Sequence, residues 1–225
     1  MRSQARYPID SATALSVIIH PKNPFAPSMH FHISYMEPRG KGGYWRLIAD
    51  LNPSIPSSDD TAAFKANLGT IRHLDADIQE AAFLFGDRYF YIPSLDRHRG
   101  ECHLFVGDLT EGDMPKKEQY ELAHDLAQST IKCYAGLVQK QLDAHPQATI
   151  TAEDRARQLH YHTLYLFQVL TLDRGTTHGL LAHDENDVGT LGSLPNHVDR
   201  ALLQSWLPNV PAPQDELLKQ VIAIL

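Results

Sequence analysis

The sequence has few cysteines and little positive charge, and each shortage excludes a class of protein. Its 225 residues include two cysteines, Cys102 and Cys133, without C-x-x-C spacing, so neither a structural zinc cluster nor a disulfide framework is indicated. Lysine and arginine number 20 against 27 acidic residues, which gives a formal net charge of -7. Nucleic-acid-binding proteins normally carry a basic face, so we expect no nucleic-acid partner. A local basic pocket in an acidic chain can still hold carboxylate substrates.

Long apolar runs and targeting segments are also missing. No apolar stretch approaches the roughly 20 residues that cross a bilayer, so we expect no membrane span. The apolar run over residues 12–19 is interrupted by Thr13 and Ser16, and it ends in His-Pro without a small-residue cleavage site. Together with the sparse cysteines, this pattern predicts a protein of the reducing cytoplasm. Hydrophobic residues make up 43% of the chain, which is ordinary for a globular protein.

Three common catalytic motifs are absent as well. The chain has no Gly-x-Gly-x-x-Gly after a strand, no Walker loop and no Gly-x-Ser-x-Gly elbow. A bound nucleotide cofactor and a serine hydrolase therefore receive little support.

The first half of the chain reads mostly as strands joined by turns. Period-two alternation and short apolar runs predict strands over residues 15–20, 28–36, 44–51, 89–92 and 103–106. Asp59-Asp60 is expected to cap a helix that runs toward Leu74, and a second helix is expected over residues 75–85.

The second half is mainly helical. Apolar residues at three- and four-residue steps predict a long amphipathic helix that ends before Pro146; they are Tyr120, Ala123, Ala127, Ile131, Tyr134 and Val138. Thr151 and Asp154 form a capping-box-like start to the next segment. Periodicity leaves residues 164–172 open between helix and strand, and a last helix is expected over 215–224. We therefore expect one α+β domain over residues 1–225, with a large antiparallel sheet flanked by helices.

The strand at 28–36 carries the most informative local pattern. His30, His32 and Ser34 share one face, because residues i and i+2 on a strand point the same way, about 7 Å apart. Two such imidazoles suit either metal binding or proton transfer. With Glu37 they resemble the first motif of a cupin metal site, but no second cupin motif follows. A hydrogen-bonded or solvated histidine pair without a catalytic role is the alternative.

Other candidate residues lie further along the chain. His160 and His162 stand on an expected helix, where i and i+2 do not share a face, so we expect them at the surface. His20 ends an apolar strand beside a rigid Pro-x-x-Pro turn, a position that suits either a site edge or a structural histidine. Asp173-Arg174 either locks a turn or orients a guanidinium that binds a ligand.

Several segments together resemble one known family in order and spacing. They are residues 16–30 (SVIIHPKNPFAPSMH), 44–53, 89–92, 99–100, 104–109, 173–180 (DRGTTHGL) and 193–195. The likeness covers roughly residues 14–206, and the first and sixth segments are its most specific parts. On these residues the chain is identified as a divergent, N-terminally short member of the oxygen-dependent coproporphyrinogen III oxidase family.

The resemblance implies a fold, a reaction and a partner. The fold is a large antiparallel sheet flanked by helices, and the family assembles as a homodimer, which we expect to involve residues 164–180. The reaction is the oxidative decarboxylation of two propionates of coproporphyrinogen III to vinyl groups, with dioxygen as co-substrate, in haem biosynthesis. No organic cofactor is implied, and a divalent metal is an open alternative.

The resemblance also implies roles for individual residues. His30 matches the proton-transfer histidine, and Asp50 matches an acidic residue that can face the pyrrole nitrogens. Ser16 matches a substrate-contacting serine, and His32, Ser34, Asp173 and Arg174 are the other expected substrate-binding residues. His20 matches a proposed metal-binding histidine, so His20 and His30 are the expected ligands of any metal.

Departures from the family pattern bear on the substrate. His32 and Ser34 stand where the family has Asn-x-Arg, and residues 46–48 (RLI) replace a Gly-Gly-Gly run. Each lost arginine removes about 1.5–3 kcal/mol of carboxylate binding unless another cation, such as Arg46 or Arg99, compensates. The alternatives are a non-catalytic homologue that binds a tetrapyrrole and an enzyme with a different substrate, with or without a histidine-bound metal.

Overall fold

An antiparallel sheet lies at the centre of this computed structural model, which describes residues 9–171, 195–212 and 214–225. Within those ranges the sheet has four strands in the order β1-β2-β3-β6. Their bounds are β1 Ile9–Ile19, β2 Ser28–Pro38, β3 Tyr44–Asn52 and β6 Cys102–Leu109. The short strands β4, Tyr91–Ile92, and β5, Arg97–His98, form a separate hairpin. The predicted α+β class and antiparallel sheet are thereby confirmed.

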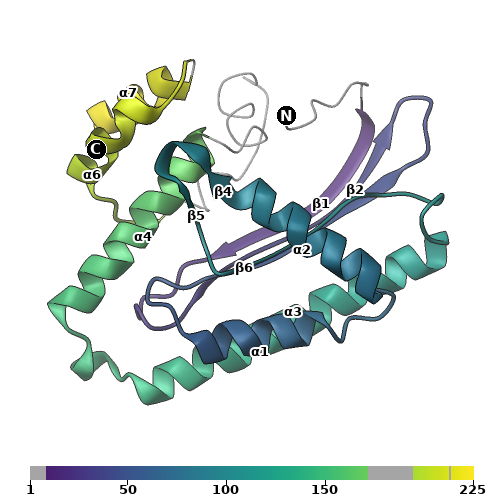
Figure 1. Cartoon of the computed structure of the whole chain (residues 1–225), viewed down its shortest axis with the longest axis horizontal. Coiled ribbons are helices and arrows are strands. Elements are labelled where there is room, and N and C mark those ends of the chain that lie inside the picture. Colours follow the sequence, from purple (N-terminus) through teal and green to yellow (C-terminus); the bar gives the residue numbers. More distant parts are fainter. Residues whose placement is uncertain (1–8, 172–194, 213) are drawn as a thin grey trace.

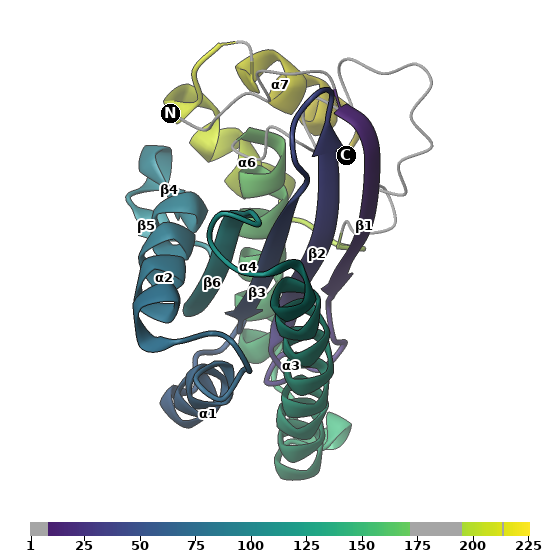
Figure 2. The same cartoon turned by 90° about the vertical axis from the view of Figure 1, so that its right-hand side faces the viewer.

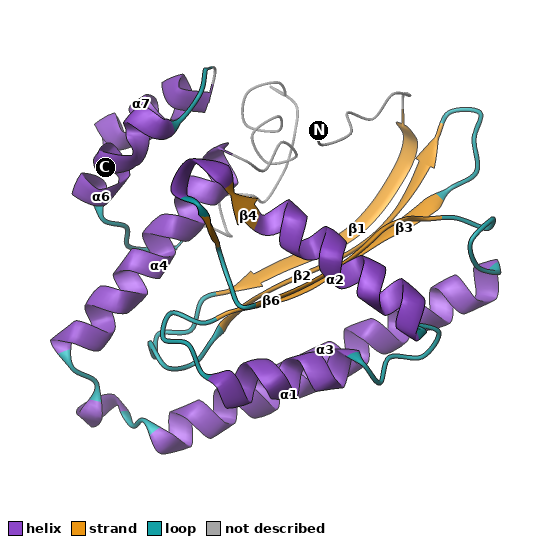
Figure 3. Ribbon diagram, in the orientation of Figure 1, coloured by secondary structure: helices purple, strands orange, loops and turns teal. Residues whose placement is uncertain are grey.

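Helices surround the strands (Figure 3). Their bounds are α1 Ser58–Leu68, α2 Ala76–Phe90, α3 Lys116–Ala144, α4 Ala152–Thr171, α6 Arg200–Trp206 and α7 Gln214–Ile224. Three-residue 3-10 turns lie at Pro93–Leu95, Gln147–Thr149 and Leu207–Asn209. The segment 164–172, which periodicity left open, is therefore helical up to Thr171.

One face of the sheet carries the main hydrophobic core. Alternation along β2 places Met29 and Phe31 on this face, as predicted, and Ile33 packs against the same cluster. β3 and β6 contribute Leu47, Ala49, Leu51, Leu104 and Val106. α1 and α3, which lie side by side in both views (Figure 1, Figure 2), cover these residues with Phe64, Leu68, Leu122, Leu126 and Leu137.

The opposite face is polar and carries the titratable side chains. β2 places His30, His32 and Ser34 there, and the C-terminal end of α2 covers part of the face with Phe90. Tyr161 and Tyr165 of α4 pack against Ile18 of β1. Beyond the sheet, α4 forms a second core with α6 and α7 (Figure 1), built on Leu164, Phe167, Leu203, Leu218 and Ile222.

Several expected boundaries were wrong. Ser57, not Asp59 or Asp60, caps α1, and its side chain accepts a hydrogen bond from the backbone of Asp60. The helix ends at Leu68, short of Leu74. The next helix, capped by Asp75, continues to Phe90, which leaves two residues of the strand expected over 89–92. Tertiary packing of Phe90 on the sheet outweighs the local strand preference.

The long helix α3 exists as predicted, but its buried stripe is displaced. Tyr120 is 61% exposed and Ile131 is 49% exposed, although both were expected to face the core. The buried side follows Leu122, Leu126 and Leu137 instead, together with Ala123 and Tyr134. Apolar residues occur on two sides of this helix, so periodicity alone did not select the correct one.

Other local signals were confirmed. Thr151 and Asp154 exchange hydrogen bonds at the start of α4: the Thr151 backbone donates to Asp154 at 2.9 Å, and the Asp154 backbone donates to Thr151 Oγ1 at 3.2 Å. Pro146 follows the end of α3. Within the described ranges no helix is both long and apolar enough to cross a membrane. The expectation of one domain over residues 1–225 stays a prediction.

Gly86 of α2 permits the closest approach of a helix to the sheet, which gives a stability prediction. A Cβ atom at Gly86 would overlap the carbonyl oxygen and carbon of His103 on β6. We expect Gly86→Ala to lower the free energy of unfolding by about 1–3 kcal/mol, because backbone atoms must move apart. Urea unfolding followed by circular dichroism measures this change.

Gly136 in the middle of α3 is the matched control. A Cβ atom there meets no heavy atom within 4 Å. Gly136→Ala should therefore raise the free energy of unfolding by about 0.5–1 kcal/mol, through better helix propensity. Equal effects of the two substitutions would contradict the close packing of α2 on β6.

Candidate active site

His30, Asp50 and His103 form one row across the polar face of the sheet. His30 on β2 is the register partner of Asp50 on β3, and Asp50 is the partner of His103 on β6. Direct partners in an antiparallel sheet point to the same side. Nδ1 of His30 lies 2.9 Å from Oδ1 of Asp50. The structure therefore brings together the two residues for which a catalytic role was predicted.

Arg99 and its neighbours hold the second oxygen of Asp50. Nη2 of Arg99 donates to Oδ2 of Asp50, and Nδ2 of Asn52 donates to the same oxygen at 2.8 Å. The other nitrogens of Arg99 donate to Oε1 of Gln168 on α4 at 2.7 Å and to Oδ1 of Asn52 at 3.3 Å. This network joins β3, the turn before β6 and α4.

The network lies inside the protein. The side chain of Asp50 is 0% exposed and that of His30 is 15% exposed. The Arg99 guanidinium packs over the rings of Phe90 and Tyr165, with its central carbon 4.5 Å and 5.2 Å from their centroids. Solvent therefore reaches this part of the row at His30 and not at Asp50.

Burial and charge act in opposite directions on Asp50. Burial by itself would raise the pKa of this carboxyl, but the positive charge of Arg99 and the contact with His30 outweigh burial, so the pKa is lowered. Likewise, burial acts to lower the pKa of Arg99, and the charge of Asp50 outweighs it, so that pKa is raised. Asp50 is therefore a fixed negative charge and not a proton donor near neutral pH.

Three further predicted residues continue along the same face. Nε2 of His32 lies 2.9 Å from Oγ of Ser34, and the ring centroids of His30 and His32 are 6.5 Å apart. Ser16 on β1 is the register partner of His32 and is exposed. Ser16, His32 and Ser34 thus form a polar strip beside His30, although the pattern that predicted them also fitted a solvated surface.

Arg46 adds a cation to this strip. It is the register partner of Ser34 on β3, and its side chain is 32% exposed. Its Nε donates to Oδ1 of Asp108 at 2.6 Å. Asp173 and Arg174 lie outside the described residues, so their predicted role stays a prediction.

His20 lies among aromatic side chains rather than beside His30. Its Nδ1 is 3.1 Å from Oγ of Ser28, and its ring lies 5.0 Å from the ring of His162 and 4.8 Å from that of Tyr165. Among the residues described, no group of three or more histidine, cysteine or acidic side chains is arranged to hold a metal ion. The surroundings of His20 and His30 therefore do not fit a metal centre, and no step is derived through one.

The two histidines of α4 point in different directions, as expected for residues i and i+2 of a helix. His160 is exposed and packs edge-on against Trp206, which confirms its surface position. His162 was also expected at the surface, and that was wrong: it turns toward His20. Burial, and then the charge of His197, lower the pKa of His162 to about 4.

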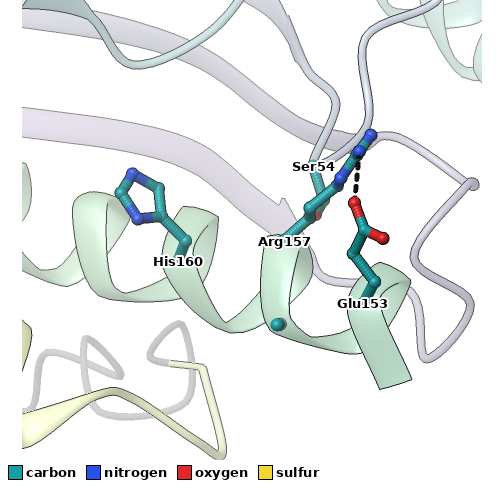
Figure 4. Close-up of a pocket in the computed structure, with 5 residues that line it drawn as sticks. Ser54, Glu153, Arg157 and His160 are labelled. Atoms are coloured by element: carbon teal, nitrogen blue, oxygen red, sulfur yellow. Dashed lines mark hydrogen bonds and ion pairs between the residues drawn. The ribbon is translucent and has the colours of Figure 1, made fainter. Parts of the chain in front are cut away.

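A surface pocket lies apart from this row (Figure 4). It is lined by Ser54, Glu153, Ala156, Arg157 and His160, and its volume is about 330 Å³. Arg157 donates to Glu153 at 2.7 Å, so the two charges at its rim pair with each other. None of the predicted catalytic or substrate-binding residues lines this pocket.

Sequence reasoning missed Arg99, Asn52 and Gln168 as parts of the site. Arg99 and Asn52 fall within segments that carried the family resemblance, but nothing local indicated that they meet Asp50. Gln168 lies within an apolar helical stretch, and a polar residue at a buried helix position was the available signal.

The buried ion pair gives a stability prediction. Asp50→Asn should lower the free energy of unfolding by about 3–5 kcal/mol, because Arg99 keeps a buried charge without its partner. The pKa of Asp50 is lowered on folding, so its contribution is complete above its unfolded value of about 4 and is lost as the pH falls below it. The variant should therefore depend less on pH in the acid range, which urea unfolding at several pH values measures.

Asp10→Asn is the matched control, since it breaks an exposed ion pair with Arg39. We expect a change below about 1 kcal/mol there. If the two substitutions cost the same, the ion pair with Arg99 does not contribute as described.

Comparison with known proteins identifies the family. The family model described as coproporphyrinogen III oxidase matches residues 2–222. The mitochondrial oxygen-dependent coproporphyrinogen-III oxidase of Rattus norvegicus is 31% identical over 192 residues, which cover 82% of this chain and 42% of the relative. The oxygen-dependent enzyme of Rickettsia rickettsii (strain Sheila Smith) is 29% identical, over 83% of this chain and 64% of the relative.

A cyanobacterial relative gives the same result. The oxygen-dependent coproporphyrinogen-III oxidase of Prochlorococcus marinus (strain MIT 9312) is 26% identical over 208 residues, covering 82% of this chain and 59% of the relative. The chain thus spans less than two thirds of the length of each of these three relatives. Since the match extends over nearly all of its residues, the chain belongs to the coproporphyrinogen III oxidase family.

Proposed function

We propose that this protein oxidatively decarboxylates a porphyrinogen, with coproporphyrinogen III as substrate and dioxygen as co-substrate, in haem biosynthesis. Family membership over residues 2–222 supports the reaction class, and the names of the relatives state both the substrate and the dependence on oxygen. The carrying observation is the row in which His30, reachable from solvent, contacts a carboxylate fixed by Arg99.

The atoms of the proposed reaction balance without an organic cofactor. Each propionate side chain loses carbon dioxide from its carboxylate and two electrons with one proton from the carbon next to the ring. Dioxygen takes up the two electrons and two protons and leaves as hydrogen peroxide. One proton per side chain must therefore come from the protein or the solvent, in addition to the proton that the substrate supplies.

His30 is the acid–base residue in this proposal. Its Nδ1 faces Asp50, which accepts a proton on that nitrogen and stabilises the charged ring. Nε2 is then the nitrogen that exchanges a proton with the substrate or with the peroxide. Asp50 stays ionised because its pKa is lowered, so it acts through His30.

Substrate carboxylates are proposed to bind along the polar strip. His32, Ser34 and Ser16 offer neutral hydrogen-bonding groups, and Arg46 offers a guanidinium that can pair with a propionate in place of Asp108. One propionate held near Arg46 leaves another free to approach His30 on the same face.

A homodimer and a cytoplasmic location complete the proposal. The family resemblance supports the first, and the sparse, unpaired cysteines Cys102 and Cys133 support the second.

The activity itself is tested with purified protein and coproporphyrinogen III in air. We expect vinyl product and peroxide to form in step, and His30→Ala to lower kcat by about 10²–10⁴-fold because the acid–base group is lost. Chromatography of the porphyrin products, together with a peroxide assay, measures both. His73→Asn serves as the control, since His73 contacts Glu118 and Glu121 away from the row.

Two outcomes would count against the proposal. Turnover that survives in His30→Ala would reject the role of this residue. Binding of the tetrapyrrole by the unchanged protein without any product would instead point to a non-catalytic homologue.

Arg46 gives a separate prediction about substrate binding. Arg46→Gln should raise KM about 10–100-fold with little change in kcat, because about 1.5–3 kcal/mol of charge-assisted hydrogen bonding to a carboxylate is lost. Steady-state kinetics measures the two constants. Arg39→Gln is the matched control, because Arg39 forms a similar pair with Asp10 but is exposed. Equal KM values for the Arg46 variant and the unchanged protein would remove Arg46 from the site.

A further inference from the structure

His103 is the third member of the row and has no role in the reaction as described so far. It stands on β6, directly opposite Asp50 in the register, so the two side chains share the polar face. Direct partners have Cβ atoms about 4.5–5.5 Å apart. His103 is 2% exposed, and its charge acts on Asp50.

The two ring nitrogens of His103 have different surroundings. Nδ1 lies 3.0 Å from Oδ1 of Asp87 on α2, whose side chain is 58% exposed. Nε2 is buried and has no hydrogen-bond partner among the residues that the structure describes. A buried nitrogen left in this way costs about 1–3 kcal/mol, so a histidine that served only to fasten β6 to α2 would gain nothing from Nε2.

The groups around His103 connect it with His30. The ring of Phe90 lies 5.3 Å from His103 and 6.1 Å from His30, so it packs against both imidazoles. The titratable or charged groups that face His103 are Asp87 on α2, Asp50 on β3 with its partner Arg99, and His98 on β5. His98 stacks on the ring at 5.4 Å and also contacts the Asp87 carbonyl oxygen at 3.0 Å.

Close packing fixes the position of Asp87. Gly86, the preceding residue, lets the backbone of α2 approach the backbone of His103 itself. The contact with His103 is the main cause of a lowered pKa of Asp87, and burial opposes it. A carboxylate in contact with solvent is thus held against a buried imidazole at the edge of the site.

We propose that Asp87 and His103 form a proton relay from solvent to the His30–Asp50 pair. It supplies the one proton per side chain that the substrate does not provide. This proposal rests on the proposed function. In the relay, Asp87 passes a proton from water to Nδ1, and Nε2 releases one into the row, so that His103 returns to its neutral form. His103 acts through His30 and is therefore a positioning residue for proton transfer.

The decisive variant is His103→Asn. Its amide nitrogen takes a place close to that of Nδ1 and can still donate to Asp87, but Nε2 is deleted. We expect kcat to fall about 10–100-fold with KM unchanged, and the acid limb of the pH–rate profile to move. Added imidazole should restore part of kcat. His73→Asn is again the control, and it should change none of these quantities.

A second measurement does not depend on turnover. The ring nitrogens of His103 are followed by ¹⁵N NMR over a pH series in the unchanged protein and in His30→Ala. We expect the titration midpoint of His103 to move when His30 is removed, because charges on coupled sites affect each other. If the unchanged protein shows no turnover, the proposed function fails while this arm still tests the coupling.

Each result bears on the relay. Unchanged kcat in His103→Asn, in a protein whose His30 is required, would overturn it. A loss of kcat without rescue by imidazole and without a change in the pH profile would assign His103 a purely structural role. A His103 titration that is the same with and without His30 would also overturn the relay.

Discussion

The ion pair between Asp50 and Arg99 is the constraint on which the rest of the site depends. Removing both charges from water is costly, and the pair persists because Asn52 and Gln168 satisfy further hydrogen-bonding positions. Since Arg99 lies before β6 and Gln168 lies on α4, the pair also ties the sheet to the helical second half of the chain. His30 takes its orientation from the oxygen of Asp50 that Arg99 leaves free.

The same pair divides the polar face into an inner part and an accessible part. Phe90 and Tyr165 cover the guanidinium, so the charge of Asp50 is not spent on water and acts on its neighbours in a medium of low polarity. On the opposite face of the same strands, Met29, Phe31 and Leu47 build an apolar core without any titratable group. The period of two along β2 thus separates the part of the strand that stabilises the fold from the part that carries the chemistry.

Local patterns predicted what depends on local structure. Alternation along residues 28–36 identified both faces of β2, and the Thr151–Asp154 cap marked the start of α4. What local patterns could not supply is pairing between distant segments. Nothing near Arg99 indicates Asp50, 49 residues earlier, and nothing in α3 shows that Leu122 rather than Tyr120 faces the sheet. His162 was misjudged for the same reason, because its burial depends on the β1–β2 turn that brings His20 against α4.

The graded exposure of the row determines how chemistry can proceed in it. Asp50 is fully enclosed and His103 is 2% exposed, whereas His30 is 15% exposed, so a substrate meets His30 first. The pKa of Asp50 is lowered, so this carboxylate cannot take up the proton that His30 must receive and pass on near neutral pH. A proton then has two physical routes to His30: bulk water at its open side, or the imidazole of His103 at the closed side. A bound macrocycle would cover the open side, and under that condition only the route through Asp87 and His103 still begins in solvent.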